Sequence, residues 1–410
     1  MEKRVTMLKI LCFYLLIILL PAGCSLTNST RQETPTIVTT SGAVIAPTST
    51  AVETPPSTLN AKRTPTYPTP SSPTSIPTTK STTISSTIKP VIHKQPGDNY
   101  EILISISVDQ NSSIQYEILT QAIEGPNAIA VLPDDSFLIA DPVGDQLLRY
   151  DQTGHLLKIM DLDELGIGYI RDLRVKGNEI FLLETSYQKY RVHRLTIDGS
   201  LVASEEIPYG FPVDAKEKDY TLENALTGIA IDCDDRIVLE VTSGSRLFPL
   251  SEVQKQSDSS HITQGLLCNG KRYFVSRSGP WIDPQVSAGE FFYQTYLTYG
   301  LGGLNYLNLF QDGSIYIVRN DVVTDPVITV DKTVHYIGAD GVVQGVARVP
   351  LSEFFYPVMR SAAVNAKGEV FVLLPRKDSL DVVRLNFYTE LGPLIPGAEI
   401  PQITMIPNNP

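Results

Sequence analysis

The chain has 410 residues, a formal net charge of -12 and a pI near 5.0, and 42% of its residues are hydrophobic. The first 90 residues carry a net positive charge, so the remainder is more acidic than the chain as a whole. A strongly acidic domain repels a phosphate backbone, which argues against nucleic acid as a partner and favours cationic ligands. The hydrophobic content is sufficient for a globular core.

The N-terminal segment predicts an export signal. Lys3, Arg4 and Lys9 accompany an apolar run over residues 10–20, which is followed by small residues and a cysteine. A run of this length spans roughly 16 Å as a helix, about half of the hydrocarbon core of a bilayer. That length is typical of a signal peptide rather than of a membrane span. We therefore expect residues 1–23 to be removed, with an uncleaved anchor as the alternative.

Ala22 and Gly23 directly precede Cys24, and this sequence resembles the lipobox of bacterial lipoproteins. The resemblance implies that Cys24 receives a diacylglycerol and becomes the mature N-terminus. It places the protein at the extracytoplasmic face of the cell membrane, where stable attachment requires more than one acyl chain. Pro21 departs from the pattern, which prefers Leu at that position. An ordinary secretory signal with a chance cysteine is therefore the alternative.

Residues 24–97 predict a disordered tether. They are rich in Thr, Pro and Ser, as in the stretch TPTYPTPSSPTSIPTTKSTT, and they have no apolar period. Such a segment cannot bury enough surface to offset its chain entropy, and its prolines favour an extended conformation. The reach would be on the order of 200 Å at full extension. The tether is either a passive linker or an O-glycosylated stalk.

From about residue 98, short β-rich runs alternate with turn residues in a repeating unit. The clearest unit spans residues 127–162, with strands expected at 128–132, 137–140, 146–150 and 155–160. Further units are expected at 170–208, from 228, at 266–299, at 304–350 and at 361–388. Four-stranded units of this kind stack and close into a ring. The sequence predicts an all-β, six-bladed β-propeller over residues 98–410, with five or seven blades as alternatives.

Turn residues recur at two phases of this unit. Between the first and second strands they occur at residues 134–135, 176–178, 234–235, 311–313 and 367–368, and between the third and fourth at 153–154, 198–199 and 340–341. Asp, Asn and Gly accept the positive φ that tight hairpins require. The acidic run around Asp234 is therefore interpreted as a hairpin turn rather than as a cation site.

The segment 101–124 precedes the first full unit and contains two strand-like runs, EILISISV and SIQYEILT. We expect the second run to pair with the last blade and close the ring. A separate small hairpin on one face is the competing interpretation.

Residues 129–154 resemble the NHL repeat, and Glu124-Gly125-Pro126 resembles the opening of gluconolactonase-type six-bladed propellers. The second resemblance implies that Glu124 binds a divalent cation such as calcium in the central channel. Residues 226–228 read Leu-Thr-Gly where that family has Pro-Asp-Gly, so a second carboxylate ligand is missing. Calcium takes about six to eight oxygen ligands. Glu124 is either a metal ligand or a solvated residue that leads into a strand.

Two cysteines remain in the exported domain, since Cys12 leaves with the signal and Cys24 is lipidated. An even count in an oxidising compartment favours a disulfide between Cys233 and Cys268. The five histidines show no pair at metal-ligand spacing, and His155, His193 and His335 fall in third or fourth strands. Those strands form the outer part of a blade, away from a channel site.

The segment 281–306 is rich in aromatic residues and holds the single Trp. Aromatic side chains at a propeller mouth can stack on sugars or grip peptides, although they also pack between blades. The candidate ligand-binding residues are Trp281, Phe291, Phe292, Tyr293 and Tyr296. We predict a non-catalytic module that binds an unknown protein or carbohydrate, with no catalytic residue and no resident cofactor. A metal-dependent propeller hydrolase or lactonase is the alternative, and a structural envelope component is a third interpretation.

Overall fold

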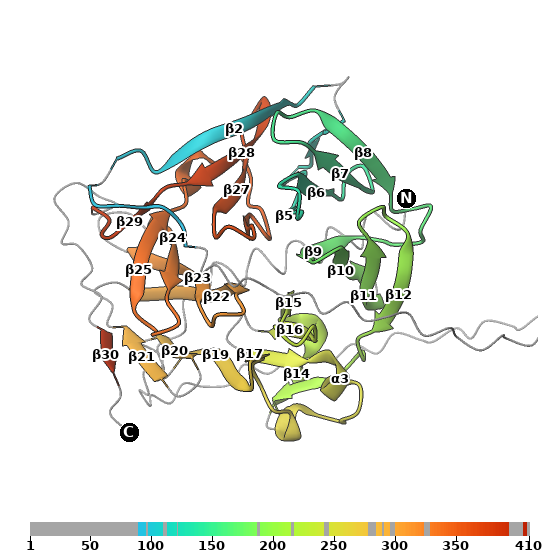
Figure 1. Cartoon of the computed structure of the whole chain (residues 1–410). Coiled ribbons are helices and arrows are strands. Elements are labelled where there is room, and N and C mark those ends of the chain that lie inside the picture. Colours follow the sequence, from blue (N-terminus) through green and yellow to red (C-terminus); the bar gives the residue numbers. More distant parts are fainter. Residues whose placement is uncertain are drawn as a thin grey trace, which may run out of the picture. The chain divides into compact units, whose positions relative to one another are not determined.

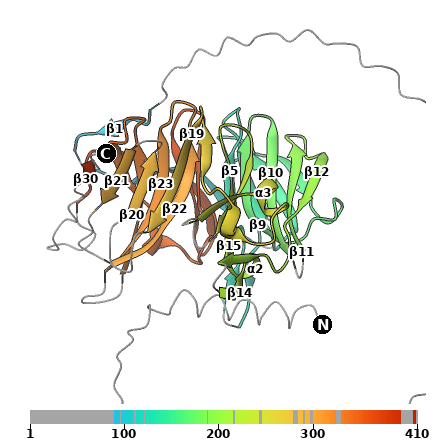
Figure 2. The ribbon, with the colours of Figure 1, turned by 90° about the horizontal axis from the view of Figure 1, so that it is seen from below.

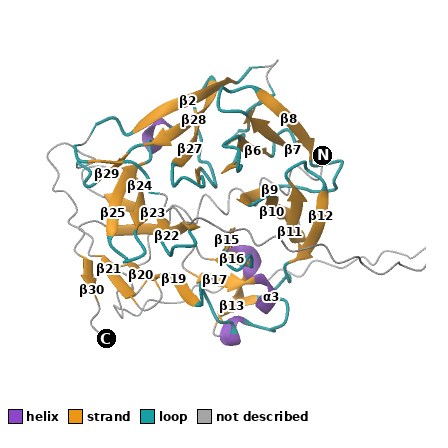
Figure 3. Cartoon of the chain, in the orientation of Figure 1, coloured by secondary structure: helices purple, strands orange, loops and turns teal. Residues whose placement is uncertain are grey.

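The computed structural model describes residues 89–95, 97–109, 113–120, 122–186, 189–214, 217–241, 246–277, 284–288, 291–295, 300–323, 329–392 and 405–407. All of these residues belong to one compact unit, residues 80–410. They form sheets that are antiparallel except for the pair β1–β29, with a few short helical turns (Figure 3). No helix in this described part is both long and apolar enough to cross a membrane.

Six sheets of three or more strands follow one another along the described chain. Blades 1 to 3 are β5–β8 (Ala128–Val131, Phe137–Asp141, Gln146–Tyr150, Leu156–Asp161), β9–β12 (Ile170–Lys176, Glu179–Ser186, Lys189–Thr196, Leu201–Glu206) and β15–β17 (Leu226–Ile231, Ile237–Val241, Arg246–Pro249). Blade 4 contains β18–β21 (Leu266–Cys268, Lys271–Arg277, Pro284–Ala288, Phe291–Thr295), and blade 5 contains β22–β25 (Gly300–Leu309, Ile315–Val323, Thr329–Ile337, Val343–Arg348). Blade 6 contains β26–β28 (Ala362–Val364, Val370–Pro375, Ser379–Leu385) and an N-terminal strand, β2 (Tyr100–Ser107).

The sheets stand around a common axis as a β-propeller, which confirms the predicted fold class (Figures 1 and 2). In blades 1, 2, 3, 5 and 6, the first strand of the repeating unit lies toward the axis. Strand β5 contacts β9 and β26, and β15 contacts β9 and β22, so the inner strands meet around the centre. Among the described residues, five sheets have at least four strands, and blade 3 has three.

Ring closure uses a different strand from the one predicted. Strand β2, the first of the two strand-like runs, pairs antiparallel with β28 over nearly its whole length, from Tyr100 opposite Leu385 to Ser107 opposite Ser379. The second run instead forms a short hairpin, β3–β4 (Glu117–Ile118 and Ile123–Glu124). The prediction was wrong because β28 has seven residues and needs a long partner. Only β2 supplies eight residues with inward-facing Ile104 and Ile106.

The hairpin turns have the chemistry that the sequence predicted. Asp135 and Asp235 have φ values of 63° and 60°, and Gly313 and Gly368 have 88° and 78°. Carboxylates and amides at these turns accept backbone N–H groups two residues on, as Asp312 does from Ser314 at 2.9 Å. Local bonds of this kind satisfy the backbone of the turn without any distant contact.

The hydrophobic core lies between the blades rather than at one centre. Separate buried clusters fill the interfaces of blades 1 and 2, 2 and 3, 1 and 6, and 5 and 6, and another joins blades 3, 4 and 5. The inner strands therefore need apolar residues on both faces. This explains the continuous buried runs of β5 and β6 and the absence of simple alternation there.

Some outer edges are covered by additional strands. In blade 5, β29 (Phe387–Tyr388) lies between β25 and β1 (Ile92–His93), and in blade 4, β30 (Met405–Pro407) pairs with β21. Beside blade 3 lie the hairpin β13–β14 (Pro212–Asp214 and Glu217–Thr221) and the single-turn helices α2 (Leu222–Ala225) and α3 (Leu250–Val253). In blades 1 and 2, β8 and β12 are the terminal strands of their sheets.

Candidate functional site

Four charged side chains meet at the centre of the ring. Arg360, which leads into β26, donates to both carboxylate oxygens of Asp172 at 3.0 and 2.8 Å and to Glu240 at 2.6 Å. Arg174 donates to the other oxygen of Glu240 at 2.9 Å and to the backbone oxygen of Ile229 at 2.7 Å. Strands β9 and β16 supply the other three side chains, so this central charge network joins blades 2, 3 and 6.

The central charge network also reaches blade 5. Arg174 donates to the carbonyl of Leu307 and Arg360 to that of Tyr306, at 3.2 and 3.3 Å. A Cβ atom at Gly228 would lie 2.3 Å from Nη2 of Arg360 and 2.6 Å from Oδ2 of Asp172. Only glycine at this position leaves space for the side chains of Arg360 and Asp172.

The charges of the central network balance one another. Burial alone would raise the pKa of Asp172, but the charges of Arg360 and Arg174 outweigh it and hold that pKa below its ordinary value. Burial raises the pKa of Glu240, although the same two guanidinium groups oppose the shift. Two cations thus neutralise two anions in a buried site. Each carboxylate is engaged on both oxygens, which leaves neither of them free to bind a metal ion.

A cavity of about 70 Å³ lies along the inner strands, beside Arg174. Its walls come from β5, β9, β15, β22 and β26, and its lining includes Lys176. The Lys176 ammonium donates to the carbonyl of Asp232 at 3.0 Å and lies 3.6 Å from the carboxylate of Asp235. The space suits a few water molecules rather than an organic substrate.

Lys332 lies on β24, close to Arg360. Burial, together with the charge of Arg360, lowers the pKa of Lys332 to about 8. Its ammonium donates to Oγ of Ser361 at 2.9 Å, and Ser361 is itself buried. On the same strand, burial and the charge of Arg319 lower the pKa of His335 to about 3, so this imidazole is neutral at physiological pH.

Glu124 lies in β4, directly opposite Glu117. Burial, and then the charge of Glu117, raises the pKa of Glu124. Throughout the described part of the chain, no group of three or more His, Cys, Asp or Glu side chains is placed to share a metal ion. Among the described residues, Glu124 therefore belongs to no such group of three, and Glu117 is the carboxylate opposite it.

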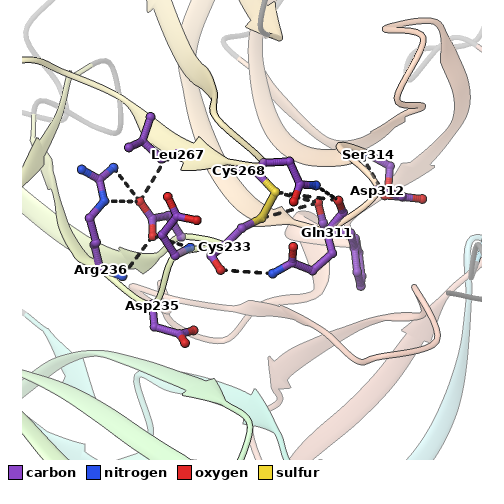
Figure 4. Close-up of a disulfide and its surroundings, with 12 residues drawn as sticks. Cys233, Asp235, Arg236, Leu267, Cys268, Gln311, Asp312 and Ser314 are labelled. Carbon is purple, nitrogen blue, oxygen red and sulfur yellow. Dashed lines mark hydrogen bonds and ion pairs between the residues drawn. A yellow bond between two sulfur atoms is a disulfide. The ribbon is translucent and has the colours of Figure 1, made fainter. Parts of the chain in front are cut away.

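Cys233 and Cys268 form a disulfide, with their Cα atoms 4.7 Å apart (Figure 4). Cys233 follows β15 and Cys268 ends β18, so the bond joins blade 3 to blade 4. The Gln311 side chain donates to the carbonyl of Cys233 at 3.1 Å, which adds blade 5 to the junction. Asp232 accepts backbone N–H groups from Asp234 and Arg236, so this acidic run is a hairpin turn.

The remaining predicted site residues lie outside what the structure describes. This applies to Cys24, to Trp281 and Tyr296, and to the side chains of residues 291–293 in β21. The lipid anchor and the aromatic ligand site stay predictions.

A second buried cluster lies in blade 2. His193, on β11, is within 2.8 Å of Glu184 through Nε2 and within 2.8 Å of Ser204 through Nδ1. The side chains of His193 and Glu184 are each 3% exposed. Burial would raise the pKa of Glu184, but hydrogen bonds from His193, Ser186 and the Gly168 N–H lower it below its ordinary value.

Sequence reasoning missed both clusters. The available signal was a charged residue inside an otherwise apolar strand, as in the runs around Asp172 and Glu240. Charged residues are rarely buried without a partner, so each of them predicts an ion pair. The partners themselves come from other blades.

No protein-family model matches the chain, and a search of curated proteins finds no match. The chain is similar to solved structures of virginiamycin B lyase from Staphylococcus aureus (13% identity, covering 67% of this chain and 99% of that one, TM-score 0.34) and of the PQQ-bound aldose sugar dehydrogenase from Streptomyces coelicolor (10% identity, 70% and 98%, TM-score 0.39). Likenesses this distant carry no argument about chemistry, and the propeller assignment rests on the sheet topology.

Proposed function

We propose that this protein is a lipid-anchored, extracytoplasmic binding module that captures a protein partner along the outer edge of blade 1. The observation that carries the proposal is the contrast between blade edges. Strands β29, β1 and β30 extend blades 5 and 4, whereas β8 ends its sheet and exposes Leu156, Leu157 and Ile159. Natural proteins usually cover, charge or shorten an apolar edge strand, and uncovered ones accept an added strand.

The backbone of β8 supports this mode of binding. Leu162 donates to the carbonyl of Asp145 at 2.9 Å, and the ladder with β7 alternates from that pair. By this alternation, the N–H and C=O groups of Ile159 and Asp161 point away from β7. The side chains of Leu157 and Ile159 are 53% and 51% exposed, so Ile159 offers backbone and apolar contacts together and Leu157 adds apolar surface.

Charge defines the kind of partner. Asp145, Asp161 and Asp163 gather at the end of β8, and the last two raise the pKa of Asp145 after burial does. An extended segment with apolar residues opposite Leu157 and Ile159, followed by lysine or arginine, would complement this edge. The net negative charge of the globular part also favours a positively charged partner.

The centre of the ring supports a structural role for the channel. Its charged groups neutralise one another, and the cavity beside them holds only about 70 Å³. We therefore place no chemistry in the channel, and the proposed binding surface lies on the circumference.

The anchor is supported by the residues around Cys24. Mass spectrometry of the mature protein tests it, and we expect an N-terminal cysteine bearing diacylglycerol. Cys24→Ser should release the protein from the membrane fraction. A free thiol on Cys24 would refute the anchor without affecting the propeller.

The binding surface can be tested with a synthetic peptide of alternating Val and Lys residues, using fluorescence anisotropy. Ile159→Pro removes an outward N–H and leaves the bonds to β7, so it should weaken binding at least tenfold. Glu206→Pro makes the matching change on β12, where alternation from the bond between Ile207 and Tyr190 turns the N–H of residue 206 outward, and it is the control. Equal affinity for all three proteins, or binding of an oligosaccharide set but of no peptide, would overturn the proposed surface.

A further inference from the structure

In the second buried cluster, a hydroxyl, an imidazole and a carboxylate are linked in series by hydrogen bonds. This is the arrangement of a nucleophile, its general base and the acid that orients the base. Glu184 on β10, His193 on β11 and Ser204 on β12 point to the same face of blade 2, and His193 lies directly opposite Ser204 in the ladder. Both hydrogen bonds of the imidazole are 2.8 Å long. Base and acid are buried, whereas Ser204 is exposed.

The proton positions follow from the partners of Glu184. This carboxylate is ionised and accepts from Ser186 Oγ and from the Gly168 N–H, at 2.8 and 3.1 Å. An ionised carboxylate only accepts hydrogen bonds, so Nε2 of His193 carries the proton that binds Glu184. In the neutral ring, Nδ1 then has a free lone pair and accepts from the hydroxyl of Ser204. The imidazole is thus in the tautomer that can remove the serine proton.

The backbone around Ser204 is open to a reacting group. Ile207 donates to the carbonyl of Tyr190 at 2.8 Å, and alternation from that pair turns the N–H of Ser204 away from β11. Since β12 is the last strand of its sheet, no described strand receives this N–H. A free N–H beside the nucleophile can stabilise a developing oxyanion. Leu201 and Val202, which precede it, are 41% and 51% exposed.

We propose that Ser204 is the nucleophile of an acyl-transfer site, with His193 as its general base and Glu184 as the positioning residue. The substrate class is an ester with an apolar acyl chain, which the exposed Leu201 and Val202 would contact. Ser204 Oγ forms a bond to the acyl carbon as its proton passes to Nδ1 of His193. The alcohol then leaves with that proton, and water releases the acyl group by the reverse transfer.

This inference goes beyond the proposed function and is independent of it, because the site lies on blade 2 and its test needs no protein partner. A fluorophosphonate probe on the purified propeller is the direct assay. Phosphorus bonds to Ser204 Oγ, fluoride leaves, and His193 takes the proton. Peptide mass spectrometry should find the label on Ser204. Ser204→Ala should abolish it, and Ser200→Ala, on the same hairpin, should not change it.

Positioning is tested with Glu184→Gln and His193→Gln, each checked for folding by circular dichroism. General-base catalysis contributes about 10²–10⁴-fold, so labelling should slow by at least about 100-fold in the His193 variant. The Glu184 variant should also change the pH profile of labelling, which a merely structural acid would not do. Absence of label on Ser204, or an unchanged labelling rate in folded His193→Gln protein, would overturn the site.

Discussion

The two buried clusters use the same kinds of side chain for different ends. In the central charge network, Asp172 and Glu240 face two guanidinium groups, and each carboxylate oxygen already has a partner. In blade 2, Glu184 faces one imidazole, whose second nitrogen meets an exposed hydroxyl. In the first cluster, the charged groups satisfy one another. In the second, the chain of hydrogen bonds reaches the exposed Ser204 hydroxyl.

The difference shows that buried charge alone does not indicate a reactive site. Arginine is always protonated and presents a planar fork, so it holds a paired carboxylate but cannot accept a proton from another group. Histidine has two nitrogens and passes a proton between them and their partners. On this argument, the network is a latch that holds blades together, whereas the blade 2 cluster contains an imidazole that can accept a proton from a neighbour.

Breaking the latch should give the largest loss of stability. Asp172→Ala leaves Arg360 with only one carboxylate partner in a buried position, and removing one partner of a buried pair costs about 3–5 kcal/mol. Urea unfolding monitored by circular dichroism would measure it. Glu206→Ala removes the exposed pair with Arg191 and should cost less than about 1 kcal/mol. Similar losses in both variants would contradict the latch.

Removing the disulfide tests a second junction of blade 3. Cys233 follows the C-terminal end of β15, whereas Gly228 lies near its start. The bond closes a loop with a sequence separation of 35, for which the chain-entropy model gives about 3–4 kcal/mol. The double variant Cys233→Ser, Cys268→Ser should lower the unfolding free energy by that amount. An Ellman assay on denatured wild-type protein should find neither cysteine as a free thiol. Two free thiols would rule out the bond.

Filling the space at Gly228 should strain the latch without removing a charge. A Cβ atom there meets Arg360 and Asp172, and overpacking of this kind typically costs about 1–3 kcal/mol. Gly166→Ala is not a suitable control because Gly166 has a positive φ, whereas Gly392→Ala meets no atom within 4 Å. Thermal melts of Gly228→Ala and Gly392→Ala should therefore differ, and equal midpoints would show that the network adapts freely.

Local features of the fold could be predicted from the sequence. Asp235 and Gly313 mark turns because tight hairpins require positive φ, and the neighbouring residues satisfy those turns from within. The same kinds of turn residue allowed the strand boundaries in blade 1 to be predicted. Cys233 and Cys268 could be paired by elimination, because the other two cysteines lie in the predicted signal and at its predicted cleavage site.

The latch could not be predicted, because its partners are far apart in the chain. Asp172 and Arg360 are separated by 188 residues, and their contact depends on how the ring closes. Ring closure in turn depends on which N-terminal run pairs with β28, and both runs have strand-like sequences. Strand β2 pairs with β28 because the two have matched lengths, eight and seven residues. The length of β28 is known only from the structure.

The smallest effect is expected from Glu184→Gln, and it should depend on pH. The folded protein holds the pKa of Glu184 below its ordinary value of 4.5, so the folded state binds fewer protons there than the unfolded chain. The ionised carboxylate therefore contributes stability above about pH 4.5, and that contribution is lost as the pH falls through the lower folded value. Glutamine keeps an acceptor for His193 but loses the charge, so we expect a cost of about 1 kcal/mol at pH 7. Because glutamine does not titrate, the difference between wild-type and variant unfolding free energies should shrink between pH 5 and 3. A difference that stays constant over that range would mean that Glu184 is already protonated at neutral pH, and the proton assignment for His193 would fall with it.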